Sequence, residues 1–246
     1  SSDLASALAT ALPGLPARPP YLIGLRKIYK YAEMADDAAL FGASALRFET
    51  ATPMYKGAQA YGGQVYVPEL RRRVSLAEER GQPDAPVALS DATLRYFKRR
   101  IWRTLRKRGE LADPTFAELA AAYLLTIRPA DIGTRATWTH FVYGANGQWS
   151  REPRASGPLA RNWTASQLLQ RNDPQAKPRY GSLTFLELPS VPTSERPEAF
   201  PDLWEARPDL GLRLAGESPI WPVAVLGLRV LKANADFVRE LSSGQL

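Results

Sequence analysis

The strongest constraint on the fold is a central stretch in which apolar and basic residues recur with the period of a helix. It reads DATLRYFKRRIWRTLRKRGE and spans residues 91–110. At about 100° per residue, its leucines, phenylalanine and isoleucine fall within one narrow arc, and its arginines and lysines fall on the opposite side. Ser90 is placed to cap the first turn, and Gly109 is placed to end the helix. Such a helix has to lie at a surface, with its apolar side against other elements.

The basic charge of the chain is concentrated in this helix. Residues 95–108 carry eight basic and no acidic side chains, whereas the whole chain of 246 residues has a formal net charge of +7, so the remainder comes to about −1. This concentration suggests three hypotheses: a solvated face partly paired with acids of the same chain, a site for an acidic protein surface, and a site for nucleic acid. The residues expected to contact a partner are Arg95, Lys98, Arg99, Arg100, Arg103, Arg106 and Lys107.

Aromatic residues stand among these cations. Tyr96 and Trp102 lie close to arginines on the helical wheel. This mixture is typical of nucleic-acid sites, because guanidinium groups contact phosphates while rings stack on bases. Packing of both rings on neighbouring helices explains the same pattern. Arg71–Arg73 would extend the basic surface if they lay beside it.

Further helices are predicted along most of the chain. Asp113 and Pro114 begin a second amphipathic helix, which together with the basic helix predicts an antiparallel pair joined by about four residues. Residues 64–67 resemble a strand without an evident partner. Helical spacing and the residues at helix starts also predict further helices. These cover 21–35, 68–80, 163–169, 198–206 and 220–233, and others begin at Asp36–Asp37, at Asp209 and at Asp236.

These elements predict an all-α fold of stacked antiparallel helical hairpins, either HEAT-like or an irregular α-solenoid. One long polar loop is expected over about 144–180, where glycine, proline and charged residues interrupt the pattern. Residues 1–20 are expected to form a short helix and a proline-rich linker, because the apolar stretch lacks the basic leader of a secretion signal. Residues 21–246 are then expected to form a single helical-repeat-like domain.

Two stretches support this fold by resemblance. TLRYFKRRIWRTLRKRGE with the alanine-rich helix after it, and EAFPDLWEARPDLGLRLAGESPIWPVAVLGLRVLKA, resemble HEAT-like helical-repeat segments of large bacterial multidomain proteins. The resemblance implies stacked helical pairs and a role in binding or assembly, and it transfers no catalytic residue. The residues that match the packing positions are Phe97, Ile101, Trp102, Leu105, Phe200, Leu203 and Trp204.

Residues suited to catalysis or metal binding do not form a recognisable motif. His140 is the only histidine, and its aromatic neighbours favour a packed imidazole. The chain has no cysteine, which excludes disulfides, thiolate chemistry and cysteine–metal sites. Adjacent acids such as Asp36–Asp37 diverge on a helix, and Gly62–Gly63 and 144–147 have the spacing of turns rather than of phosphate loops. We therefore expect no catalytic residue, no cofactor and no metal.

The sequence thus favours a non-catalytic helical scaffold that binds a protein partner or a neighbouring domain through its basic helix. Nucleic-acid binding along residues 91–108 is the alternative. Trp149, in a polar segment, is expected to serve as an exposed anchor, unless its ring packs on its own loop. No apolar run reaches the roughly 18 residues of a membrane span. A bacterial, cytoplasmic protein is expected from the absence of cysteine and from the resemblance, and the initial serine suggests an excerpt of a longer chain.

Overall fold

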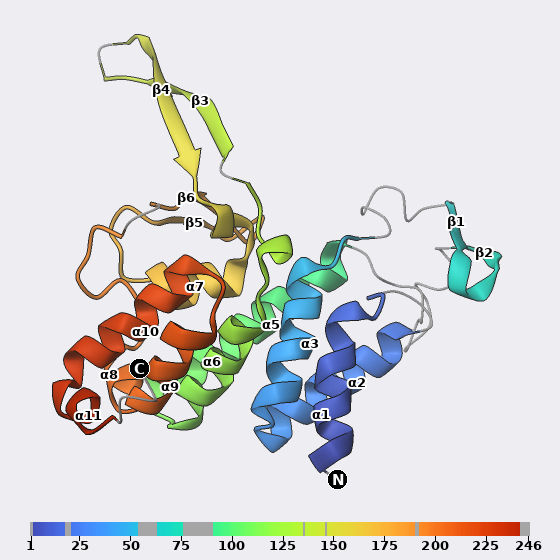
Figure 1. Cartoon of the computed structure of the whole chain (residues 1–246). Helices are drawn as coiled ribbons and strands as arrows, with labels where there is room; N and C mark the ends of the chain where they lie inside the picture. The colour runs from blue at the N-terminus through green and yellow to red at the C-terminus, as the bar shows by residue number, and fades with distance from the viewer. Residues whose placement is uncertain are drawn as a thin grey trace. The chain divides into compact units, whose positions relative to one another are not determined.

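The computed structural model is mostly helical and divides into two compact units. It describes residues 2–17, 21–53, 63–75, 91–134, 136–145, 147–189 and 192–241. Unit 1 extends to Ile127, and unit 2 begins at Arg128 (Figure 1). The N-terminal helix belongs to unit 1, and the single domain expected over 21–246 stays a prediction.

Unit 1 is built around a central helix. This helix, α3, contacts α1, α2, α5 and α6. Asp37 caps α3, as predicted, by accepting a hydrogen bond from the Leu40 N–H at 3.0 Å. The α-helices of unit 1 are α1 (Ser2–Ala11), α2 (Tyr21–Ala35), α3 (Ala38–Thr50), α5 (Asp91–Glu110) and α6 (Thr115–Thr126), and a 3-10 turn (Leu12–Gly14) follows α1.

An aromatic cluster joins three of these helices. The rings of Phe48 on α3 and Phe97 on α5 are stacked, with centroids 3.9 Å apart and planes 5° apart. The Tyr29 ring on α2 meets both of them edge-on, with centroid distances of 6.0 and 5.8 Å. All three side chains are buried. Burial of each ring stabilises the fold by about 1.5–3 kcal/mol, so this cluster fixes where α5 lies.

One predicted helix of unit 1 is wrong. Residues 68–75 form a 3-10 turn (Pro68–Leu70) and a strand, β2 (Arg72–Ser75), and residues 76–80 lie outside the described residues. The strand β2 pairs antiparallel with β1 (Gln64–Val67) and supplies the partner that the sequence did not reveal. Val67 and Val74 form a small buried cluster between them. This cross-strand packing outweighs the helical spacing of the same residues.

Unit 2 combines helices with two small antiparallel sheets. Its strands are β3 (Ala136–Tyr143), β4 (Trp149–Ser156), β5 (Lys177–Arg179) and β6 (Thr184–Glu187), with 3-10 turns at Pro129–Asp131 and Pro158–Arg161. Its helices are α7 (Trp163–Gln170), α8 (Pro201–Glu205), α9 (Pro208–Glu217), α10 (Trp221–Ala233) and α11 (Ala235–Glu240). These helices lie close to their predicted positions.

The long polar loop expected over 144–180 is also wrong. Most of these residues form β4, α7 and β5, and only the turn at 144–148 joins the paired strands β3 and β4. Gly147 has φ of +75°, a conformation that glycine adopts without strain, and its N–H donates to the Gly144 carbonyl. In Figure 1 this hairpin extends beyond the helices of its own unit.

The core of unit 2 lies around α7, α9 and α10. Every residue of α7 is buried, including its polar side chains. The helices α9 and α10 approach closely at two glycines, since a Cβ on Gly227 would lie 2.5 Å from the Gly211 carbonyl oxygen. Within the described residues, no helix combines the length and apolar character needed to cross a membrane.

Candidate interaction surface on the basic helix

The helix α5 is seated on unit 1 through its apolar side, as its periodicity predicts. Leu94, Phe97, Ile101 and Leu105 are all buried. Trp102, which lies at the edge of the apolar arc, is buried as well. Trp102 is therefore part of the core and does not take part in an outer aromatic surface.

The ends of α5 differ from the sequence prediction in one respect. Gly109 lies inside the helix, which continues to Glu110. The left-handed residue that turns the chain is Ala112, with φ of +52°. The carboxylate of Asp113 then accepts the Thr115 N–H at 2.9 Å and so starts α6. Ser90, the predicted cap, lies outside the described residues.

Arg100 is bound within unit 1. Its guanidinium donates to both carboxylate oxygens of Glu33 on α2, with the Nε atom 3.2 and 3.0 Å from Oε1 and Oε2. Thr104 also donates to this carboxylate, and Tyr29 donates at 3.3 Å. A paired fork of this kind fixes geometry as well as charge. Arg100 therefore orients α5 and does not face a partner.

The same contacts control the protonation of Glu33. Burial alone would favour the neutral acid, but hydrogen bonds from Arg100, Thr104 and Tyr29 and the nearby positive charge favour the carboxylate. Together they hold the pKa of Glu33 below its ordinary value. Burial raises the pKa of the Tyr29 hydroxyl, which stays protonated and available as a donor.

Three more basic residues of α5 pair with acids of unit 1. Lys98 lies 3.6 Å from the buried carboxylate of Glu49 on α3. Arg108 contacts Asp36 and also Asp113, the latter at 3.2 Å. Arg106 pairs with Glu110 one turn along the helix, at 3.4 Å on the surface. Acids of the same chain thus already compensate these cations, as the solvated-face hypothesis assumed for some of the basic residues.

Three basic residues remain exposed in one row. Arg99, Arg103 and Lys107 are exposed, and none of their side chains forms an ion pair or hydrogen bond with any residue that the structure describes. Their spacing of four residues separates them by about 6 Å along the helix axis, with a rotation of about 40° at each step. We call these three residues the outer ridge.

Two further residues stand beside the outer ridge. Tyr96 is 45% exposed, and its hydroxyl oxygen accepts a hydrogen bond from Arg100 at 3.0 Å. Arg95 is partly buried and has interactions of its own within the chain. Of the seven basic residues predicted to contact a partner, the structure brings Arg99, Arg103 and Lys107 together outside and turns Lys98 and Arg100 inward.

Trp149 belongs to unit 2 and is described apart from α5. It starts β4 and is 70% exposed, with its ring centroid 5.1 Å from that of Tyr143 across the hairpin. Phe141 and Arg151 continue the same face of the hairpin, with the guanidinium 5.6 Å from the ring centroid. The ring packs on a cross-strand neighbour and still remains exposed, and its service as a partner anchor stays a prediction.

The remaining sequence candidates contribute little to a site. His140 lies in β3 opposite Glu152, and its side chain is outside the described residues. Arg72 and Arg73 are exposed on β2. Within the described ranges, no group of three or more histidine, aspartate or glutamate side chains is arranged to hold a metal ion.

Comparison with protein-family models, with curated proteins and with solved structures finds no match to this chain. The site is therefore argued from its geometry. Sequence reasoning missed the role of Glu33 and Glu49, which decide which cations of α5 face outward. The available signal was the position of each acid on the helical side that also carries the buried residues of α2 and α3.

Proposed function

We propose that this chain is a non-catalytic interaction module whose outer ridge binds an acidic surface of a partner protein or of a neighbouring domain. The observation that carries the proposal is the row of three exposed cations, Arg99, Arg103 and Lys107, without an acidic partner among the described residues. Acids of unit 1 compensate the basic residues on the inner side of the same helix. A surface with this arrangement favours binding of an external partner whose negative charges lie along one line.

The ridge is also held rigidly. The stacked rings of Phe48 and Phe97 and the forked contact between Arg100 and Glu33 fix α5 before any partner arrives. Binding to a preorganised helix costs less conformational entropy than binding to a mobile segment. An acidic helix with carboxylates four residues apart would match the ridge in spacing.

Nucleic acid is the alternative, and exposed Tyr96 beside the ridge is the observation that favours it. Three phosphate contacts on duplex DNA would give a slope of about −2.7 for the logarithm of the binding constant against the logarithm of salt concentration. Proteins that depend on phosphate contacts commonly make about 6–10 of them. The short row of three therefore favours an acidic protein surface.

The decisive experiment uses defined probes. Fluorescence anisotropy would compare a helical peptide with glutamates at i, i+4 and i+8, a peptide of the same composition with scattered glutamates, and a short DNA duplex. We expect the peptide with aligned glutamates to bind more tightly than the scattered one. Arg99→Glu/Arg103→Glu should weaken it by about tenfold, because two exposed ion pairs of up to about 1 kcal/mol each are replaced by repulsion.

Arg72→Glu/Arg73→Glu on β2 is the matched control, since it changes the net charge equally at other exposed positions. It should leave the affinity within about twofold. Equal binding of both peptides, or equal losses in both double variants, would refute recognition by the outer ridge. Duplex DNA that binds more tightly than either peptide, and only while Arg99 and Arg103 are intact, would replace the acidic partner with nucleic acid.

The finer architecture is part of the proposal. Sequential helices are in contact in the pairs α2–α3 and α5–α6 of unit 1 and α9–α10 of unit 2. We propose that such pairs represent HEAT-like hairpins adapted to display the ridge. A bacterial cytoplasmic scaffold is the setting in which this proposal would operate.

A further inference from the structure

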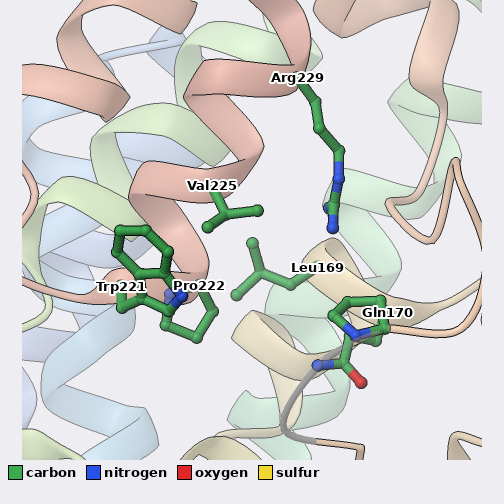
Figure 2. Close-up of a pocket in the computed structure, with 7 residues that line it drawn as sticks. Leu169, Gln170, Trp221, Pro222, Val225 and Arg229 are labelled. Atoms are coloured by element: carbon green, nitrogen blue, oxygen red, sulfur yellow. The ribbon is translucent and has the colours of Figure 1, made fainter.

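Unit 2 contains a pocket between α7 and α10, with a volume of 280 Å³. Trp221, Pro222 and Val225 of α10 line one side, and Leu169 with Gln170 at the end of α7 lines another (Figure 2). Figure 2 shows Arg229 extending from α10 toward the α7 side, beyond Val225 as seen from Trp221. Most of the lining is apolar, and the guanidinium is its charged group.

The sequence of α10 explains this lining. Val223, Leu226 and Val230 are buried in the core of unit 2. Trp221, Val225 and Arg229 recur every four residues on another side of the helix, so they form a row of about 12 Å that runs from an aromatic ring to a cation. The pocket therefore offers apolar contacts at one end and hydrogen-bond donors at the other.

The guanidinium of Arg229 retains its donors. Its nearest acid is Glu198, whose Oε2 lies 3.7 Å away, too far for a hydrogen bond. Among the described residues the Arg229 guanidinium makes no hydrogen bond beyond this ion pair, although the side chain is only 26% exposed. An arginine in this position can bind a carboxylate through two parallel N–H donors.

The negative charge of Glu198 is already compensated by another residue. Arg196 donates from Nε to Glu198 Oε1 at 2.7 Å and pairs also with Glu205. Arg196 satisfies only Oε1, whereas Oε2 is buried without a hydrogen-bond partner among the described residues and is paired with Arg229 at 3.7 Å. A ligand carboxylate would therefore share the Arg229 guanidinium with Glu198. The Arg196 pKa is raised, since these two carboxylates favour its charged form against burial.

The walls are held in place without a ligand. Asp173 accepts hydrogen bonds from the N–H and hydroxyl of Thr193, and this fixes Pro192 at the pocket. The Gln170 amide donates to the Pro189 carbonyl at 3.0 Å. These contacts hold the walls of the pocket in place, so the pocket is formed before a ligand binds.

We propose that this pocket binds a small organic carboxylate with an aromatic or branched aliphatic body. The carboxylate would lie on the Arg229 guanidinium, and the apolar body would lie against Leu169, Val225 and Trp221. A volume of 280 Å³ is just below the range of about 300–1,000 Å³ for small-molecule sites, so the ligand has to be small. The proposal does not depend on the outer ridge.

Calorimetric titration with 4-phenylbutanoate, its neutral amide 4-phenylbutanamide, and acetate tests both halves of the site. We expect the phenyl carboxylate to bind about tenfold more tightly than the amide, because a charged hydrogen-bonded pair adds to the same apolar contact. Acetate should bind more weakly than either. Equal affinity for the carboxylate and the amide, or no saturable binding at millimolar concentration, would overturn the proposal without the need for any variant.

Two variants then locate the site. Arg229→Gln should abolish the preference for the carboxylate and leave amide binding unchanged, and Val225→Phe should fill the pocket and abolish both. Arg213→Gln, an exposed arginine on α9, is the matched control and should change neither affinity. Carboxylate preference that persists in Arg229→Gln, or is lost equally in Arg213→Gln, would place binding elsewhere and refute the assignment.

Discussion

Glu33 accepts hydrogen bonds from Tyr29 on its own helix and from Arg100 and Thr104 on α5. Its side chain is only 12% exposed. The carboxylate therefore depends on these partners to replace the hydrogen bonds to water that it loses on burial. The contact ties α2 to α5 and determines which side of α5 meets solvent. At the scale of the single residue, an acid on α2 thus controls the basic surface.

We predict that Glu33→Gln lowers the free energy of unfolding by about 1–3 kcal/mol at neutral pH, because the amide cannot accept a charged fork from Arg100. Urea unfolding followed by circular dichroism would measure the difference. Glu110→Gln is the control, since Glu110 pairs with Arg106 at the surface, and its effect should stay below about 1 kcal/mol.

This difference should depend on pH in one direction. The pKa of Glu33 is lowered on folding from an unfolded value of about 4.5, so its stabilisation is fully present above pH 4.5 and is lost as the pH falls through the folded pKa. Wild type and Glu33→Gln should therefore converge in stability below about pH 4.5. A gap that stays constant down to pH 3 would show that the charge of Glu33 is not the cause.

The basic helix and its buried side were predictable from periodicity, because Phe97, Ile101 and Leu105 follow helical spacing over about two turns. The pairing of its cations was not. Glu33 and Glu49 precede their partners by 67 and 49 residues, and only the packing of α2 and α3 against α5 brings them within reach. The helical position of each acid indicates that it faces inward, but local sequence does not identify the cation that it meets.

At the scale of the element, two helix pairs rely on glycine for their spacing. A Cβ on Gly42 of α3 would lie 2.7 Å from the backbone of Ala122 on α6, and one on Gly227 of α10 would meet the backbone of α9 at 2.5 Å. Helices that touch through backbone atoms in this way leave no room for a side chain, so adding a methyl group there must shift one helix.

Gly42→Ala should therefore destabilise unit 1 by about 1–3 kcal/mol, although alanine favours helices. Gly24→Ala on α2 is the matched control, because no heavy atom lies within 4 Å of the position of its Cβ. There the gain in helix propensity should stabilise the protein by about 0.5–1 kcal/mol. Thermal unfolding of both variants measures the two effects, and shifts of the same sign would contradict the close approach of α3 and α6.

The β3–β4 hairpin shows why part of unit 2 was mispredicted. Its first strand, ATWTHFVY, is rich in β-branched and aromatic residues, and Gly147 supplies the turn, so a signal was present. The polar residues of β4 concealed it. Since this hairpin is exposed on the face of Tyr143 and Trp149, no apolar alternation marks its second strand.

At the scale of the whole molecule, the chain forms two units with separate cores. Each has about the size of an ordinary domain. Unit 1 is organised around α3 and its aromatic neighbours, whereas unit 2 is organised around buried α7 and the close pair α9–α10. The helical class was predictable from sequence, but a division at Ile127 was not, because proline and glycine, which follow it as Pro129 and Gly133, are no more frequent there than elsewhere in the chain.

We predict that residues 128–246, expressed alone, retain a helical circular dichroism spectrum and unfold cooperatively on heating, because their core is complete without unit 1. A shorter fragment, 188–246, lacks α7 and should not fold, since it would expose the faces that α7 covers in the core. Gradual melting of the longer fragment, or cooperative melting of the shorter one, would show that the cores are not independent in this way.

The forked contact between Arg100 and Glu33 also limits which insertions α5 can accept during evolution. It sets the angular phase of α5, and every residue inserted after Arg100 would rotate the remaining turns of the helix by about 100°. Point substitutions at Arg103 or Lys107 alter only the strength of attraction. One added residue between Arg100 and Arg103 would instead aim the later cations of the row in a new direction and would also turn Leu105 away from the core in which it is buried.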